Sequence, residues 1–264
     1  MATEALERKL HLREKRYEVE QLIKEKRSEE FDALEEVFDK PTLMLIYRLL
    51  NQGRLSHIHG CIEAGKESRV YLGEDPKGKQ VAVKIFLKST AEFRKGRMTY
   101  LEGDPRFQRI RRDTRSLIYL WAQKEYKNLQ TASSAGVSVP RPILVRGNVL
   151  VMQFIGDKGV PAPLLKDRES DVTAKLYERL LKEVKLLYDK AGLVHADLSE
   201  YNVMMWRSRP VMIDMSQAVS LNHPLADTFL RRDLSNLNSF FAKHSVQVKS
   251  IDHLCAWVIG KDAV

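Results

Sequence analysis

The residues whose spacing indicates chemistry lie in the stretch 194–203, Val-His-Ala-Asp-Leu-Ser-Glu-Tyr-Asn-Val. Asp197 and Asn202 lie five positions apart, and Asp214 follows the apolar run 211–213. Phosphoryl transfer from Mg-ATP needs oxygen ligands for the metal and a further carboxylate that positions or deprotonates the attacking hydroxyl. The spacing therefore predicts a phosphotransferase site. The plainer interpretation is a turn aspartate, a loop asparagine and a strand-end aspartate.

A lysine stands inside an apolar strand pattern at 81–85, Val-Ala-Val-Lys-Ile. An ammonium group in such a position is costly to bury unless an anion meets it. The phosphates of ATP and a helix carboxylate would supply that anion, and Glu125, in the middle of a predicted helix, is the expected partner of Lys84. The alternative is an edge-strand lysine that reaches solvent.

A short loop precedes the strand before Lys84 and reads Glu-Ala-Gly-Lys-Glu-Ser-Arg-Val-Tyr at 63–71. It holds a single glycine, so it is neither a Gly-x-Gly-x-x-Gly loop nor a Walker loop. Gly65 would let the backbone approach a phosphate, with Lys66 or Ser68 as contacts. Taken alone the loop favours a hairpin turn, but its place one strand before the lysine favours a nucleotide loop.

The elements that must position these residues follow a two-lobe order. A β-rich first part is followed by a Gly/Pro-rich hinge at 156–163 and then by mostly helical sequence. We expect helices at 4–38, from Pro41 to Gly53, from the cap Asp113 to about Ser134, and at 170–191, 224–243 and 252–259. We expect strands at 58–62, 69–73 and 81–87, a β region from Pro140 to Phe154, and a short β insert at 193–214.

Composition excludes several classes of protein. The chain of 264 residues is 44% apolar and 30% charged, as in ordinary globular proteins. No apolar run reaches the roughly 18 residues of a membrane span, and the charged N-terminus has no signal-peptide core. Cys61 and Cys255 have no metal-like spacing. We therefore expect a cytoplasmic protein with no membrane partner.

Positive charge is concentrated in one part of the chain. The net charge is +9, and residues 84–127 hold twelve Lys or Arg against five Asp or Glu, a net +7. Such a block favours a polyanionic partner, with a solvated basic face as the alternative. Residues 88–115 show no periodicity, and we expect them to form a mobile basic loop that docks on RNA or on a phosphorylated partner. Arginines at its end would meet phosphate: Arg109, Arg111, Arg112 and Arg115.

The order of nucleotide loop, strand lysine, helix glutamate, hinge, Asp-x4-Asn and strand-end aspartate resembles the protein-kinase fold. Three strings resemble the RIO family of atypical kinases: Gly65-Lys-Glu-Ser, His195-Ala-Asp-Leu-Ser-Glu-Tyr-Asn202 and Ile213-Asp-Met-Ser-Gln217. Three more resemble its type-one branch, which includes archaeal proteins: Phe38-Asp-Lys-Pro-Thr-Leu, Phe154-Ile-Gly-Asp157 and Ala162-Pro-Leu-Leu-Lys166. The resemblance covers roughly residues 31–245.

The resemblance implies an α+β, bilobal protein-kinase-like fold with a β-rich N-lobe and a helical C-lobe. The fold would be reduced, without the activation segment and peptide-substrate subdomains, because only 50 residues follow Asp214 and none of them form an Ala-Pro-Glu string. The expected parts are an N-terminal helical extension at 1–55, an N-lobe at 56–155 with the basic insertion 88–115, and a C-lobe at 156–264.

The resemblance also implies a role for each matching residue. Asp197 is the expected catalytic proton acceptor, and Asn202 and Asp214 are the expected ligands of Mg²⁺, or of Mn²⁺. Asp214 is also implied as a transient phospho-acceptor and so as a catalytic residue. ATP would be bound by Gly65, Lys66, Glu67, Ser68, Lys84, Glu125, Met152 at the gatekeeper position, and the backbone of Gln153 and Ile155.

The function that the resemblance implies is an ATP-dependent serine/threonine kinase with ATPase activity. It would act in ribosomal small-subunit maturation, with the pre-ribosomal small subunit and its rRNA as partner. Two alternatives stay open on the residues alone. One is a small-molecule phosphotransferase of the aminoglycoside and choline kinase type, which shares a similar Asp-x4-Asn loop. The other is a kinase-fold RNA-binding module that acts as an assembly switch.

Overall fold

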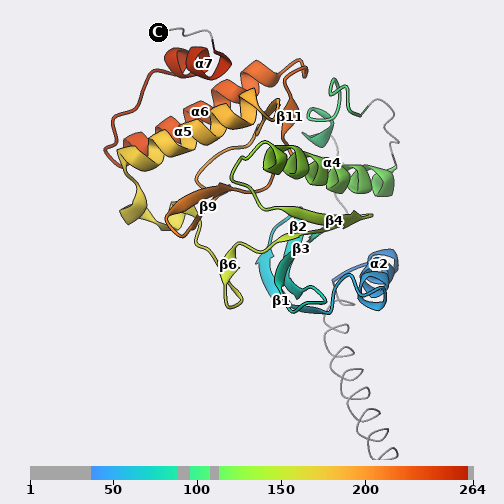
Figure 1. Cartoon of the computed structure of the whole chain (residues 1–264). Helices are drawn as coiled ribbons and strands as arrows, with labels where there is room; N and C mark the ends of the chain where they lie inside the picture. Colours follow the sequence, from blue (N-terminus) through green and yellow to red (C-terminus); the bar gives the residue numbers. More distant parts are fainter. Residues whose placement is uncertain (1–36, 88–95, 108–112, 261–264) are drawn as a thin grey trace, which may run out of the picture.

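The computed structural model describes residues 37–87, 96–107 and 113–260 (Figure 1). The helix predicted at 4–38 therefore lies almost wholly outside the described residues, as do Arg109, Arg111 and Arg112. The described chain forms a small sheet lobe and a helical lobe joined near residue 155 (Figure 1). The predicted α+β, two-lobe order is confirmed.

The N-lobe is built on a five-stranded antiparallel sheet with the order β1-β2-β3-β5-β4. Its strands lie close to the predicted segments, and each neighbour in the sheet runs antiparallel to the next. They are β1 (His57–Ala64), β2 (Ser68–Glu74), β3 (Gln80–Phe86), β4 (Pro142–Arg146) and β5 (Val149–Gln153). The central position of β3 means that both edges of the lysine strand are hydrogen-bonded and its side chains point to the two faces of the sheet.

The two faces of β3 are covered by different helices. Val81, Val83 and Ile85 pack in one apolar cluster with α2 (Lys40–Asn51). The alternate residues Ala82 and Phe86 belong to clusters on the opposite face. Because side chains alternate along a strand, Lys84 lies on that opposite face, toward α4 and the cleft between the lobes.

Both N-lobe helices begin where the sequence predicts. Asp39 caps α2 by accepting a hydrogen bond from the Thr42 amide at 3.1 Å, and Asp113 caps α4 (Thr114–Ser134) by accepting from the Ser116 amide at 2.9 Å. Gly147, with φ of +56°, turns the chain between β4 and β5. A Cβ atom there would lie within 3.1 Å of the Tyr119 ring, so the glycine lets this turn approach α4 closely.

The prediction of a mobile loop over 88–115 is wrong for its described parts, since 113–115 begin α4 and 96–107 pack into the protein. Leu101 is fully buried and Phe107 is 7% exposed, so this segment packs into the main core. Three of its four charged residues are paired: Arg97 is 3% exposed with Nη2 3.4 Å from Glu67, and Arg106 contacts Asp104 at 2.6 Å. Sequence analysis did not predict that this segment packs, because its charged residues interrupt the apolar periodicity that indicates a packed element.

The hinge region and C-lobe complete the fold. The hairpin β6 (Gly156–Asp157) and β7 (Val160–Pro161) lies between the lobes. In the described C-lobe, helices that pack together lie next to short strand pairs (Figure 1). The helices are α5 (Ala174–Asp189), α6 (Ala226–Lys243) and α7 (Ile251–Ile259), with 3-10 turns η1 (Leu165–Asp167) and η2 (Glu169–Asp171) before them. The strands are β8 (Leu193–Val194), β9 (Val203–Trp206), β10 (Arg209–Met212) and β11 (Val219–Ser220).

The stretch from Asp214 to α6 is short. Strand β11 pairs with β8, and α6 begins at Ala226, with only eleven residues between it and Asp214. An activation segment and a peptide-binding platform cannot fit in that connection. The expected reduction of the kinase-like fold is therefore present.

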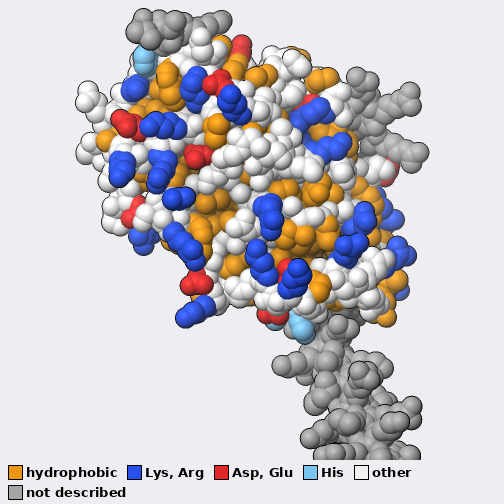
Figure 2. Space-filling view, in the orientation of Figure 1, with side chains coloured by type: hydrophobic (Ala, Val, Ile, Leu, Met, Phe, Trp, Pro, Cys, Tyr) orange, Lys and Arg blue, Asp and Glu red, His pale blue; other side chains and the backbone are white. Residues whose placement is uncertain are grey.

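The surface is rich in positive charge. On the face that Figure 2 shows, Lys and Arg side chains spread over both lobes and alternate with smaller apolar areas. Among the described helices, none has the length and apolar character needed to cross a bilayer.

Candidate active site

The loop 195–202 connects β8 to β9 and carries two of the predicted site residues. Its conformation is held by Asp233 of α6, which is 1% exposed and accepts hydrogen bonds from the amides of Ala196 at 2.8 Å and Leu198 at 2.9 Å. Ala196 adopts the left-handed conformation with φ of +64°, and its carbonyl accepts from Arg232. Burial raises the pKa of Asp233, and the two amide donors oppose that shift.

Asp197 is held from two sides. Gln217 donates to its Oδ2 at 2.9 Å, and Asn202 donates to its backbone carbonyl at 2.7 Å and to Oδ2 at 3.3 Å. Burial, and next the charge of Asp214, raise the pKa of Asp197 to about 6. A carboxyl whose pKa lies near neutrality suits a group that must accept a proton.

Asp214 follows β10 in a left-handed conformation with φ of +56°. Its Oδ1 accepts from the Ser216 hydroxyl at 2.6 Å and lies 3.0 Å from Lys84 Nζ. Burial works to raise the pKa of Asp214, but Lys84 and the Ser216 hydroxyl lower it to about 2. Asp214 is therefore ionised at neutral pH.

Lys84 bridges the two lobes. Its Nζ lies 2.9 Å from Glu125 Oε2 and 3.0 Å from Asp214 Oδ1, with the Lys84 side chain 6% exposed and that of Glu125 1% exposed. Burial acts to lower the pKa of Lys84, but the carboxylates of Asp214 and Glu125 raise it above its ordinary value. Burial raises the pKa of Glu125 to about 7 against the effect of the Lys84 ammonium. The lysine is therefore a fixed cation between two acidic groups.

Helix α4 is bonded directly to the segment that follows Asp214. Lys124 Nζ donates to the carbonyl of Ser216 at 2.9 Å and also to Ala218 at 2.5 Å. Asn128 donates to the carbonyls of Met215 and Ala218 at 2.8 and 2.9 Å. These bonds fix the helix that carries Glu125 to the loop that carries Asp214.

A cavity of about 270 Å³ lies beside these groups, between the sheet and the C-lobe. It is lined by Ser68, Lys84, Met152, Gln153, Ile155, Asn202 and Asp214 among the predicted site residues. Two backbone bonds set the edge of this cavity: the Gln153 amide donates to the Arg141 carbonyl at 2.8 Å, and the Ile155 carbonyl accepts from Ala162 at 2.9 Å. The Gln153 carbonyl and the Ile155 amide are not used in those bonds.

Four other predicted nucleotide residues lie outside the lining of this cavity: Glu125 on α4, and Gly65, Lys66 and Glu67 at the turn between β1 and β2. The Gly65 amide donates to the Ser68 carbonyl at 3.0 Å, and a Cβ atom on Gly65 would lie 3.2 Å from that carbonyl oxygen. Lys66 is exposed, and Glu67 turns toward Arg97. Of this turn, only Ser68 reaches the cavity.

Two residues that line this cavity each have a side-chain oxygen suited to a hard cation. The amide nitrogen of Asn202 is used by Asp197, which leaves Asn202 Oδ1 for a ligand. Oδ1 of Asp214 is used by Ser216 and Lys84, which leaves Oδ2. Mg²⁺ is usually held by one or two protein oxygens together with substrate phosphates and water, so this donor pair fits it. Within the described residues there is no larger cluster of His, Cys, Asp or Glu that could hold a metal.

Sequence reasoning missed the residues that position the site from a distance. Asp233, Lys124 and Asn128 act across 35 to 94 positions in the chain, and no local pattern marks them. Gln217 lies inside the string 213–217 and could have been found as a polar side chain three residues after Asp214. His195 braces the loop through a 3.0 Å bond between its Nε2 and the Ile213 carbonyl, and burial lowers its pKa to about 4, so it is neutral.

Comparisons with known proteins agree with this geometry. The model of the RIO domain matches residues 69–254. The RIO-type serine/threonine-protein kinase Rio1 of Methanocaldococcus jannaschii is 40% identical over 252 residues, covering 94% of this chain and 85% of the relative. The Haloferax volcanii protein of the same name is 38% identical, covering 90% of this chain and 81% of the relative.

Eukaryotic relatives are longer. Human serine/threonine-protein kinase RIO1 is 39% identical over 86% of this chain, but the match covers only 40% of the human protein. Among solved structures, the Rio2 kinase–ADP/Mg²⁺–phosphoaspartate complex from Chaetomium thermophilum superposes with a TM-score of 0.61 at 24% identity, covering 84% of this chain and 67% of that one. That likeness supports the kinase-like fold.

Proposed function

The chain belongs to the RIO family of atypical kinases, and from this premise we propose that it is an ATP-dependent serine/threonine kinase that also hydrolyses ATP. The observation that carries the proposal is the convergence of Lys84, Asn202 and Asp214 on one cavity, with Asp197 hydrogen-bonded to Asn202. These residues come from β3, the loop after β8 and the end of β10, so no single local motif explains their meeting.

Each residue then has a defined task. Lys84, held by Glu125, would neutralise charge on the phosphates of ATP, and the adenine would bond to the Gln153 carbonyl and the Ile155 amide. Mg²⁺ bound by Asn202 and Asp214 would offset the charge that develops on the transferred phosphoryl group. Asp197 would accept the proton of the attacking hydroxyl as its oxygen bonds to the γ-phosphorus and ADP leaves. Gln217 orients the Asp197 carboxylate for this step.

The ATPase reaction would use Asp214 as a transient phospho-acceptor. An Asp214 oxygen would attack the γ-phosphorus with release of ADP, and water would then cleave the acyl phosphate to phosphate and the free carboxylate. The name of the Rio2 complex, which contains a phosphoaspartate, supports this route for the fold. The low pKa of Asp214, about 2, also supports it, because the attacking group must be ionised.

Trapping the labelled intermediate tests the ATPase route. Protein incubated with γ-labelled Mg-ATP and quenched in acid should hold label that hydroxylamine removes, as expected of an acyl phosphate. Asp214→Asn should lose this label and bind Mg-ATP more weakly, while Asp157→Asn, an exposed aspartate of the β6–β7 hairpin, should behave as the wild type. Wild-type labelling in Asp214→Asn would refute the assignment of Asp214.

For the partner, we propose RNA of the small-subunit precursor of the ribosome, at a cytoplasmic location. The support is the family resemblance together with the net charge of +9 and the net +7 carried by residues 84–127. The part of that block at 96–107 is packed in the core, so the contacts are assigned to Arg115 at the start of α4 and to the neighbouring Arg109, Arg111 and Arg112.

Changing these four arginines to Glu should weaken binding to small-subunit RNA. The slope of log affinity against log salt should fall by about one unit for each lost phosphate contact. ATP affinity should change little, because Arg115, the described member of the four, does not line the nucleotide cavity. Unchanged RNA affinity in the variant would refute this surface.

A further inference from the structure

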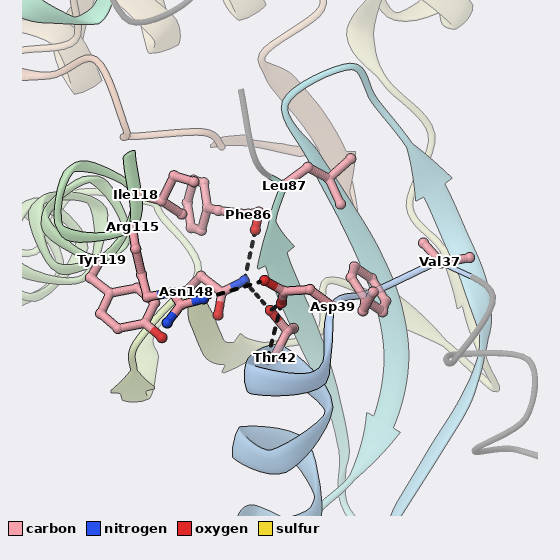
Figure 3. A pocket seen from close by; sticks show the side chains of 10 residues that line it. Val37, Asp39, Thr42, Phe86, Leu87, Arg115, Ile118, Tyr119 and Asn148 are labelled. Carbon is pink, nitrogen blue, oxygen red and sulfur yellow. Dashed lines mark hydrogen bonds and ion pairs between the residues drawn. The ribbon is translucent and has the colours of Figure 1, made fainter. Parts of the chain in front are cut away.

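A second cavity, of about 340 Å³, lies at the back of the N-lobe (Figure 3). It is formed where α2, the end of β3, the first turns of α4 and the turn between β4 and β5 meet. Its volume falls in the range of small-molecule sites. It shares no lining residue with the nucleotide cavity, so a molecule bound in it need not compete with ATP.

The cavity contains a buried hydrogen-bond acceptor that lacks a donor. Asn148 is 5% exposed, and its Nδ2 donates to the Phe86 carbonyl at 2.8 Å and to Thr42 Oγ1 at 3.0 Å. The carbonyl can only accept, which fixes the orientation of the amide. Asn148 Oδ1 is buried and has no hydrogen-bond partner. Buried acceptors without a donor are rare and costly, so this atom calls for an N–H or O–H group of a ligand.

The rim of the cavity holds one cation, Arg115, beside one anion, Asp39. The Arg115 side chain is 55% exposed, and its Nη2 lies 4.0 Å from Asp39 Oδ2, a long ion pair. Arg115 stands in the first turn of α4, where the helix amides add positive potential and no acidic residue follows the cap. Arg115, Tyr119 and Asn148 all line this cavity, as Figure 3 shows. An anionic group of the same ligand can therefore meet Arg115.

The walls between these polar groups are apolar, with Val37, Leu87 and Ile118 among the lining side chains. We propose that this cavity is a second ligand site that takes a small planar aromatic acid with a ring N–H, the N–H donating to Asn148 Oδ1 and the carboxylate lying at Arg115. An indole carrying a short carboxylate side chain has this combination of groups.

The site lies where it can act on the nucleotide cavity. Phe86, in its wall, is two residues from Lys84 on β3, and Ile118 is seven residues from Glu125, about 10 Å along α4. A ligand that fills the space between these two elements holds together the strand of Lys84 and the helix of Glu125. This coupling rests on the proposed function, whereas binding itself does not, and the two are measured separately.

Binding is measured with the full chain in the absence of nucleotide, by titration of indole-3-acetate with calorimetry and with amide NMR shifts. We expect saturable binding with shifts at residues of α2, at the start of α4 and at Asn148. 1-Methylindole-3-acetate, which lacks the N–H, should bind about tenfold more weakly. This comparison leaves the protein unchanged, so misfolding cannot imitate its result.

The acid group is tested with Arg115→Gln, with Arg209→Gln on the exposed end of β10 as the matched control. Arg115→Gln should weaken indole-3-acetate about threefold and leave indole-3-acetamide unchanged.

The coupling is tested by measuring the affinity for Mg-ATP with the cavity occupied, and Mg-ATP should then bind about fivefold more tightly. Absence of indole-3-acetate binding, equal affinity for the methylated probe, or competition with ATP would overturn the site. Unchanged ATP affinity at saturating indole-3-acetate would overturn the coupling.

Discussion

The Lys84 ammonium and the Glu125 carboxylate lie 2.9 Å apart, both buried, at the point where β3 meets α4. The same Lys84 Nζ lies 3.0 Å from Asp214. Helix α4 holds the segment after Asp214 through Lys124 and Asn128, which donate to the carbonyls of Ser216 and Met215. Strand, helix and the Asp214 loop are therefore joined around one lysine. A substitution that breaks the pair should therefore change both the rate of ATP turnover and the affinity for the nucleotide.

Glu125→Gln tests this relationship while keeping the shape of the side chain. Lys84 would lose one of its two carboxylates and its alignment on the phosphates, so ATP turnover should fall about 10- to 100-fold. Steady-state ATPase measurements check this, with the exposed Glu102→Gln as the control. Wild-type turnover in Glu125→Gln would show that Asp214 alone positions the lysine.

The pH dependence of turnover should report Asp197. Because burial and Asp214 raise its pKa to about 6, and because the base must be ionised, kcat/KM for ATP should rise with pH through about 6 and then level off. Gln217→Met removes the donor that favours the ionised form, so the rise should move up by about one pH unit. The exposed Gln247→Met serves as the control, and an identical profile in all three proteins would contradict the assignment.

Asp233 should contribute both to the stability of the folded protein and to ATP turnover. The Asp233 carboxylate accepts from two backbone amides, one at each oxygen. In Asp233→Asn one of these oxygens is replaced by an NH₂ group, which cannot accept. One buried amide of the loop then lacks an acceptor, at a cost of about 1–3 kcal/mol in the free energy of unfolding. The melting temperature should fall by about 2–10 °C, and turnover should fall with it. The exposed Asp157→Asn should change neither the melting temperature nor the fold. Wild-type turnover and wild-type melting temperature in Asp233→Asn would refute the role of Asp233 in positioning the loop.

Much of the fold could be predicted because its signals are local. The caps Asp39 and Asp113, the alternation along β3 and the Gly/Pro-rich hinge each act within a few residues. The pairing of Lys84 with Glu125 was also expected, because a buried cation needs an anion and the predicted helix offered one.

The parts that sequence analysis missed depend on contacts between distant segments. The charged stretch 96–107 is packed because Arg97 meets Glu67 and because Arg106 meets Asp104 and Asn128, and charge pairs leave no periodic pattern. In the sequence, Asp233 cannot be distinguished from other polar residues of an amphipathic helix. Its role appears only from its contact with the loop 195–202. The cavity at Asn148 likewise arises only from the meeting of four separate elements.

The central claim is that this site transfers the γ-phosphoryl group of ATP with Asp197 as the proton acceptor. Single-turnover transfer of the γ-phosphoryl group from Mg-ATP to a serine hydroxyl acceptor, followed with wild type and Asp197→Asn at equal nucleotide occupancy, tests it most directly. We expect the wild type to phosphorylate the acceptor and Asp197→Asn to bind Mg-ATP within a few-fold of the wild type but to transfer the group at least about 100-fold more slowly. Equal single-turnover rates, or failure of the wild type to phosphorylate the acceptor from bound Mg-ATP, would contradict the claim.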